Sequence, residues 1–213
     1  MFLKRHPPKL PPKPSQRPNS SKMTQSPPGD KHVFCHFMMG NTYPYTEATF
    51  TTDISVAQSA GIDGFALNIG QDTWTSSRIA TFFSVSQKYP NFKLFFSFDM
   101  SIISDANTLV NYVLQYKDHP NSYKYRGKYF MSTFAGESTT FGHADPNEGW
   151  DREVISKLRE RNVDVCFVPS FSGVDAWQMY NKFPVVDGAF SWAAWYFSPC
   201  PFHISIFGSG KSS

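Results

Sequence analysis

The chain has 213 residues, of which 40% are hydrophobic and 17% are charged, so it can form one packed domain of ordinary size. Six Lys or Arg residues against one Asp give residues 1–30 a charge of +5, so the total of +3 leaves −2 for the rest of the chain. This distribution does not indicate a nucleic-acid-binding face on the folded part, no apolar run is long enough to span a bilayer, and the three cysteines form no C-x-x-C pair.

The first 30 residues are rich in Pro, Lys and Ser, and we expect them to form a disordered tail. The stretch from Arg5 to Lys13 fits a basic-flanked P-x-x-P motif, which allows a weak SH3-type contact, although a solvated linker is the simpler interpretation. Only three apolar residues precede the first charge and prolines, so no secretory signal is visible and the chain as written is expected to be intracellular.

From Lys31 onward, short apolar runs rich in Phe, Val and Ile recur along the chain. Continuous apolarity over such short lengths is typical of strands that are buried on both faces. The six runs are Val33–Met39, Asp63–Ile69, Lys93–Asp99, Tyr129–Phe134, Asp164–Phe171 and Asp187–Trp195.

Amphipathic stripes between these runs predict helices, in the segments Phe50–Ala57, Ile79–Ser86, Leu109–Leu114 and Val154–Leu158. Gly61 closes the first helix, and Asp105 is placed to cap the start of the third. The fourth follows Asp151 and is expected to stop near Asn162. Strands that alternate with helices in this way imply a parallel sheet with right-handed crossovers.

Two architectures fit this pattern, an open doubly wound sheet or a (β/α)8 barrel. No G-x-G-x-x-G motif follows the first strand, which weighs against a dinucleotide-binding sheet. A complete barrel needs about 250 residues, more than the chain supplies after Val33. We therefore predict an incomplete α/β barrel of the TIM type over residues 31–197, with six strand–helix units, followed by an irregular tail at residues 198–213.

Carboxylates, amides, hydroxyls and tryptophans gather where the predicted strands end, and in a βα barrel these ends form the active-site mouth. Glycoside hydrolysis requires two carboxyl groups flanking the scissile bond. Asp72, Asp99 and Glu137 are the carboxylates present, although Asp72 would also suit a helix N-cap and Glu137 a plain loop position. The abundant aromatic rings, 17% of the residues, fit either a core or a sugar-binding cleft. The candidate substrate-binding residues are His36, Asn68, Glu137, Ser170, Trp192 and Trp195.

Taken together, the segments at the strand ends form a pattern specific enough to compare with known families. They are His36–Tyr43, Ala60–Gly70, Phe96–Met100, Ser132–Glu137, Val168–Phe171 and Gly188–Trp192. In order and spacing they resemble glycoside hydrolase family 71, the α-1,3-glucanases or mutanases, over about residues 31–195. The resemblance implies a (β/α)8 catalytic domain that hydrolyses α-1,3-glucan of the fungal cell wall, with inversion, without a cofactor or metal, and mostly outside the cell. It matches Asp72 and Asp99 to acidic positions of the family, as supporting catalytic residues.

The resemblance also implies that the main catalytic Asp and Glu lie in a Trp-Asn-Asp-x-Gly-Glu-Ser block. This sequence contains no such block. We therefore expect a truncated product that lacks the main acid pair. The alternatives are a carbohydrate-binding remnant that does not cut glucan and a fragment without function.

Overall fold

The computed structural model describes residues 31–192. The predictions for both tails, for the P-x-x-P motif and for Trp195 concern residues outside this range. Within this range, residues 32–192 belong to one compact unit.

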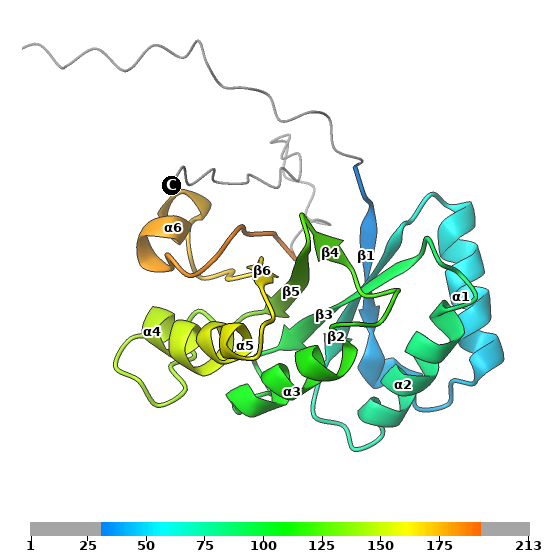
Figure 1. Ribbon diagram of the computed structural model, residues 1–213, viewed down its shortest axis with the longest axis horizontal. Helices are drawn as coiled ribbons and strands as arrows, with labels where there is room; N and C mark the ends of the chain where they lie inside the picture. The colour runs from blue at the N-terminus through cyan, green and yellow to red at the C-terminus, as the bar shows by residue number, and fades with distance from the viewer. Residues whose placement is uncertain (1–30, 193–213) are drawn as a thin grey trace, which may run out of the picture. The chain divides into compact units, whose positions relative to one another are not determined.

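A six-stranded sheet forms the centre of this unit, and five of its strands run parallel in the order β1-β2-β3-β5-β6 (Figure 1). The parallel strands are β1 Phe34–Met38, β2 Gly64–Ile69, β3 Lys93–Asp99, β5 Lys128–Phe134 and β6 Val165–Phe167. Each of them coincides with one of the first five predicted runs. The predicted parallel α/β sheet is therefore confirmed.

The strand prediction was wrong in two places. The sixth run, Asp187–Trp195, forms no strand in its described part. The amide of Asp187 donates to the carbonyl of Phe167 in β6 at 2.8 Å, and that of Phe190 donates to Pro169 just beyond β6 at 3.2 Å. The short β4, Lys124–Tyr125, was not predicted and pairs antiparallel with β5. It arises because Arg126 (φ 51°) and Gly127 (φ 83°) form a two-residue turn with both φ angles positive, a geometry that closes tight hairpins.

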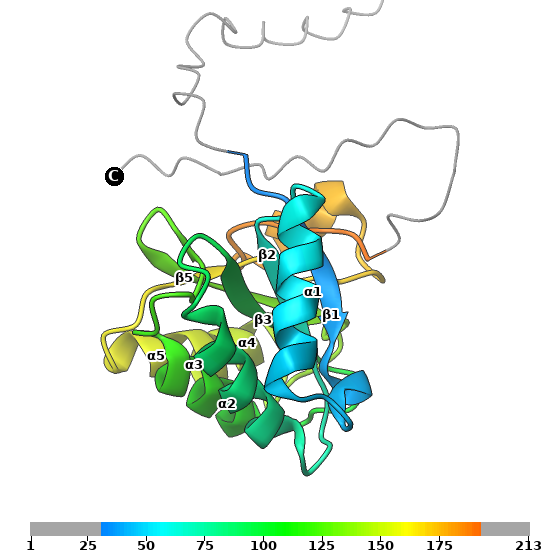
Figure 2. The same cartoon turned by 90° about the vertical axis from the view of Figure 1, so that its right-hand side faces the viewer.

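Helices cover the outer side of the sheet, and Figures 1 and 2 show α1, α2, α3 and α5 following one another around it. The elements are η1 Met39–Thr42, α1 Glu47–Ser59, α2 Thr75–Ser86, α3 Ala106–Tyr116, α4 Pro146–Trp150, η2 Asp151–Ile155, α5 Ser156–Glu160, η3 Ala176–Gln178 and α6 Met179–Lys182. The α4, η2 and α5 segments follow one another without a break, and the middle one has π-helical hydrogen bonding.

Three of the predicted helix ends are confirmed. The Asp105 carboxylate accepts from the amide of Asn107 at 3.0 Å and caps α3. Gly61 (φ 76°) and Asn162 (φ 58°) follow α1 and α5 in the left-handed region. The fourth helix starts earlier than expected, because Asp145 and Pro146 supply a cap and a first residue ahead of Asp151.

The strands bury different residues on their two faces. Alternate side chains such as Phe65, Leu67, Phe96 and Met131 join the large core beneath the helices. The residues between them form a second, smaller cluster on the opposite face: Ala66, Phe95, Tyr123, Phe130, Cys166 and Val168, with Phe34, Tyr125 and Phe190 packed against it. Burial on both faces explains why the strands read as continuous apolar runs.

The sheet is strongly curved. The strands β1 and β6 occupy opposite edges of the parallel order, and in a flat sheet four spacings of roughly 4.8 Å would separate them by about 19 Å. Yet the ring of His36 on β1 lies 5.3 Å from the ring of Phe190, whose amide donates to Pro169 just beyond β6. The second cluster therefore lies inside a curled sheet, as a partial barrel requires.

Candidate functional site

A row of buried polar side chains crosses the inner face above the second cluster. Asn68, Ser97 and Ser132 are register partners on β2, β3 and β5, and each lies two residues beyond an apolar member of that cluster. Asn68 is 4% exposed, and both serines are 0% exposed. Buried hydroxyls and amides are costly unless they are paired, so each group of this layer needs a hydrogen-bond partner.

Part of this row is satisfied within the protein, and part is not. The Ser132 hydroxyl donates to the carbonyl of Val168 at 2.7 Å, and the Asn68 amide donates to the carbonyl of Ser97 at 3.4 Å. The Ser97 hydroxyl is buried and has no hydrogen-bond partner among residues 31–192. An unpaired buried hydroxyl is unusual and calls for an explanation.

The next layer toward the carboxyl ends contains Asp99 and Ser170. Asp99 pairs with Phe134 at the end of β3, and Phe134 forms a bridge with Ser170, which is 2% exposed. The amide and the hydroxyl of Ser101 donate to Oδ1 of Asp99 at 3.1 Å and 2.5 Å. Both contacts use the same carboxylate oxygen, Oδ1, and they hold the carboxylate against the turn that follows β3.

An aromatic stack joins β1 to the last described segment, across the side of the sheet where β1 and β6 are not paired. His36 lies against Trp192 with ring centroids 3.6 Å apart and planes 22° from parallel, and Trp192 also meets Phe134 edge-on at 5.0 Å. Desolvation by burial lowers the pKa of His36 to about 4, and its Nδ1 atom has no partner in the described part of the chain. The imidazole is therefore neutral at pH 7 and has one nitrogen without a partner beside the polar layer.

Glu137 joins the loops that follow β5 and β6. Its Oε1 accepts from the amide of Gly173 at 2.8 Å, whereas Oε2 is buried and has no hydrogen-bond partner among the described residues. The preceding Gly136 has a φ of 112°, and an added Cβ would lie 2.9 Å from Cζ2 of Trp150 and 3.0 Å from Cγ of Met100. Glycine is thus required at this position for the chain to bring Glu137 to the mouth.

Trp150 is a residue that sequence analysis missed. Its side chain is 0% exposed beneath the β5–α4 loop, and its indole N–H donates to the carbonyl of Gly136 at 2.9 Å. It therefore holds the residue next to Glu137 in place. Its spacing four residues before Val154, a member of the predicted helical stripe, was the available signal.

Asp72 is exposed and lies on the rim, three residues after the end of β2. The alternative prediction, that Asp72 is the N-cap of a helix, is wrong. The N-cap residue of α2 is Trp74, and no side chain accepts a capping hydrogen bond there. Only the Asp72 backbone carbonyl takes part, accepting from the amide of Thr75 at 3.0 Å. The carboxylate lies beside Gly40 instead, since an added Cβ there would be 3.4 Å from Oδ2.

The structure thus gathers four of the candidate residues along the inner face, His36, Asn68, Asp99 and Trp192, with Ser170 beside them. Glu137 reaches the same end from the β5 loop, and Asp72 stands on the rim. Sequence analysis had noted the Ser97 and Ser132 segments but did not select these serines. Their period-2 spacing from Phe95 and Phe130 would have placed them on the inner face.

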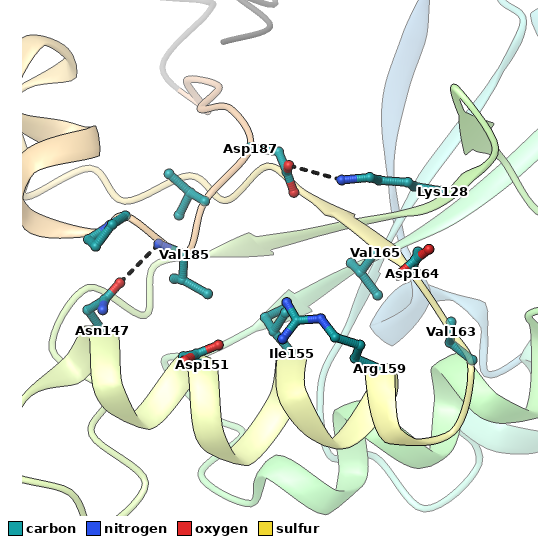
Figure 3. A pocket seen from close by; sticks show the side chains of 12 residues that line it. Lys128, Asn147, Asp151, Ile155, Arg159, Val163, Asp164, Val165, Val185 and Asp187 are labelled. Atoms are coloured by element: carbon teal, nitrogen blue, oxygen red, sulfur yellow. Dashed lines mark hydrogen bonds and ion pairs between the residues drawn. The ribbon is translucent and has the colours of Figure 1, made fainter. Parts of the chain in front are cut away.

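A separate hollow of about 580 Å³ lies on the other side of β6, between the α4–α5 helical segment and residues 184–187 (Figure 3). Lys128 and Asp187 form an ion pair across its upper part at 3.6 Å, and Asn147 accepts from the amide of Val185 at 3.1 Å. Its lining includes none of the candidate residues, so we do not assign the site there.

Within residues 31–192, no three His, Cys, Asp or Glu side chains gather where they would hold a metal ion. No helix in this described range combines the length and apolarity needed to cross a bilayer.

The sequence matches glycosyl hydrolase family 71 over residues 29–203. It is 45% identical to the glucan endo-1,3-alpha-glucosidase agn1 of Schizosaccharomyces pombe over 168 residues. This aligned region covers 78% of this chain and 39% of that protein. The ascus wall endo-1,3-alpha-glucanase of the same yeast is 34% identical over 176 residues, which cover 81% and 40% of the two chains. A mutanase of Penicillium rubens, Pc12g07500, is 32% identical over 169 residues, 78% and 35% of the two chains. The chain thus spans about two-fifths of the length of these relatives.

Among solved structures, an endo-alpha-mannosidase of family GH99 from Bacteroides thetaiotaomicron superposes with a TM-score of 0.59 at 13% identity, over 76% of this chain and 59% of that one. A second structure of the same enzyme gives 0.57 at 14% identity over 72% and 46%. At these identities the likeness concerns the fold alone. Together with the curl of the sheet, it confirms the predicted partial barrel of the TIM type.

Proposed function

The chain belongs to glycosyl hydrolase family 71, and we propose that its inner sheet face forms part of the substrate-binding cleft of an inverting endo-acting α-1,3-glucan hydrolase. The whole relatives carry the names of α-1,3-glucanases and mutanases, and the substrate proposed here is the polymer in those names. The carrying observation is the polar layer above an apolar cluster, at the carboxyl ends of parallel strands.

This layer suits a glucan because a pyranose offers hydroxyls at its edge and C–H groups on its faces. The Ser97 hydroxyl and Oε2 of Glu137 are buried hydrogen-bonding atoms without a partner in the described range, so binding a sugar hydroxyl would remove an existing cost. The stacked rings of His36 and Trp192 supply a flat apolar wall beside them.

Asp99 is the carboxylate that we propose for a supporting catalytic role. Ser101 fixes its Oδ1, so Oδ2 is positioned to accept a hydrogen bond from a glucosyl hydroxyl or from a water. Inversion requires a second carboxyl group about 6.5–9.5 Å away across the scissile bond. Asp72 on the rim and Glu137 in the β5 loop are the candidates within this chain, and the family's main acid pair is expected in a block that this sequence lacks.

The test compares two forms of the protein, the 213-residue chain and a form extended with the family's acid block. Both are incubated with insoluble α-1,3-glucan, and bound protein and released reducing ends are measured. We expect both forms to bind the polymer and the extended form to release sugar. Because the proposed reaction inverts the α-linkage, NMR should detect the β-anomer of the product first. Cleavage of another glucan in preference to α-1,3-glucan would overturn the proposed substrate.

A second candidate function is glucan binding without cleavage. It is favoured by the polar layer and the aromatic stack, which offer contacts to a sugar without requiring an acid pair. Retention on α-1,3-glucan without any released sugar from the 213-residue chain would select this function. Failure of the chain to melt cooperatively would instead support a fragment without function.

A further inference from the structure

Two aromatic side chains meet at the rim of the mouth, where β1 and β2 end. Tyr43 follows η1, and Trp74 is the residue at which α2 is capped. Their ring centroids lie 5.2 Å apart in an edge-to-face arrangement, with an angle of 77° between the planes. The Tyr43 side chain is 65% exposed, and Trp74 is partly buried behind it.

A single arginine fixes both aromatic residues. The guanidinium of Arg78 donates to the carbonyl of Tyr43 from Nε at 3.2 Å and from Nη2 at 2.7 Å. The amide of Arg78 donates to the carbonyl of Trp74 at 3.2 Å. The exposed ring of Tyr43 therefore stands on an anchored backbone, and binding to it would cost little ordering entropy.

The surroundings of this pair combine a carboxylate with further apolar surface. Oδ2 of Asp72 lies 3.4 Å from the position of an added Cβ at Gly40 and 3.9 Å from that at Gly70. Cδ1 of Ile102 lies 3.8 Å from the same position at Gly70, and its side chain is 52% exposed. A carboxylate thus lies between the segments that follow β1 and β2, with the Ile102 side chain near it on the β2 side.

Single exposed apolar residues are common on protein surfaces and need no explanation. Three of the seven large apolar residues that are exposed within the described range, however, lie at this one end of the sheet: Met38, Tyr43 and Ile102. Met38 is the register partner of Asn68, and Ile102 lies beside Gly70, two residues beyond Asn68, so these two residues adjoin the polar layer. This continuity with the cleft favours a second stretch of the same ligand as the occupant.

We propose that Tyr43, backed by Trp74, forms a distal subsite that holds a glucosyl unit of α-1,3-glucan away from the inner polar layer. The exposed face of the Tyr43 ring stacks on the C–H face of the sugar. This inference rests on the proposed function. Tyr43 acts here as a binding residue that extends the glucan-binding cleft to longer chains.

The test measures the affinity of the full 213-residue chain for an α-1,3-linked disaccharide and hexasaccharide by titration calorimetry. Tyr43→Ala is expected to weaken hexasaccharide binding about tenfold and to leave disaccharide binding unchanged. Tyr43→Phe keeps the ring face and is expected to bind both sugars like the parent. Val56→Ala, at an exposed position on α1, is the control for loss of exposed apolar surface.

The outcomes distinguish failure of the Tyr43 subsite from failure of the proposed glucan-binding function. Hexasaccharide affinity that is equal in the parent and in Tyr43→Ala would overturn the subsite, and so would an equal loss for both sugars. If Tyr43→Ala does not fold, Tyr43→Leu retains bulk without a flat ring and is expected to show the same selective loss. A parent chain that binds neither sugar would contradict the proposed function and this inference together, whereas loss of the subsite alone leaves the proposed function intact.

Discussion

The imidazole of His36 and the indole of Trp192 stack with centroids 3.6 Å apart, although they belong to the first strand and to the last described segment. This contact crosses the open side of the sheet and brings its two edges together. It also places a ring wall beside the polar layer that begins at Asn68. The curl of the sheet and the chemistry of the mouth are thus linked by one pair of side chains.

The pH dependence of stability should report the burial of His36. Its pKa falls from 6.5 to about 4 on folding, so the unfolded chain takes up a proton at a higher pH than the folded chain. The contribution to the free energy of unfolding is therefore fully present above pH 6.5 and is lost as the pH falls from 6.5 toward 4. In His36→Phe, the urea concentration at the unfolding midpoint should depend less on pH over this range than in the parent. A slope that persists unchanged would contradict the assignment to His36.

Asp99→Asn should weaken binding to α-1,3-glucan about tenfold without lowering the melting temperature. The amide oxygen of Asn still accepts from Ser101, so the turn is preserved, whereas the charge offered to the sugar is removed. Asp164→Asn, which changes a carboxylate before the amino end of β6, is the matched control and should bind like the parent. Binding affinities measured on soluble oligosaccharides decide the outcome, and equal losses in both variants would refute a specific role.

Gly136→Ala should destabilise the fold by about 2–4 kcal/mol, because the added Cβ meets both Trp150 and Met100 at a positive φ. Gly127→Ala is the control, since its φ is also positive but nothing lies within 4 Å of the added Cβ. That variant should lose only about 1 kcal/mol. Urea unfolding of both proteins gives the comparison, and equal losses would show that steric contact at Gly136 is unimportant.

Asn121 should be among the most sensitive buried polar residues. Its side-chain nitrogen lies 2.8–2.9 Å from the carbonyls of Ser86, Tyr89 and Phe92, which share its two N–H groups, and its side chain is fully buried. Asn121→Ala removes these bonds from the segment that joins α2 to β3 and should cost about 2–4 kcal/mol in chemical unfolding. The exposed Asn91→Ala should change stability by less than about 0.5 kcal/mol. A mild effect at Asn121 would mean that water replaces these bonds.

The sequence predicted the parts of the fold that depend on local pattern. Five apolar runs became β1, β2, β3, β5 and β6, and Asp105 and Asn162 mark helix ends as expected. The pattern failed where tertiary contacts decide. The segment after Asp187 has the apolarity of a strand, but in its described part it makes isolated hydrogen bonds to residues at β6 rather than a ladder.

The site was only partly predictable for a related reason. Chain order shows which residues end each strand, and so it indicated Asn68, Asp99 and Ser170. It does not show which strand-end groups face inward, and Ser97 was overlooked although it lies between Asn68 and Ser132 in the register. The rim pair of Tyr43 and Trp74 depends on Arg78 binding a distant carbonyl, which no local pattern reveals.

The most direct test of the cleft is an NMR titration of the isotope-labelled chain with an α-1,3-linked hexasaccharide. If glucan binds at the mouth, the amide signals of Asn68, Ser97, Asp99 and Ser132 should shift, while those of Asp63 and Asp164 at the amino ends of the strands should stay unchanged. Shifts confined to the amino ends, or no shifts at saturating sugar, would contradict the assignment of the mouth as a glucan-binding surface.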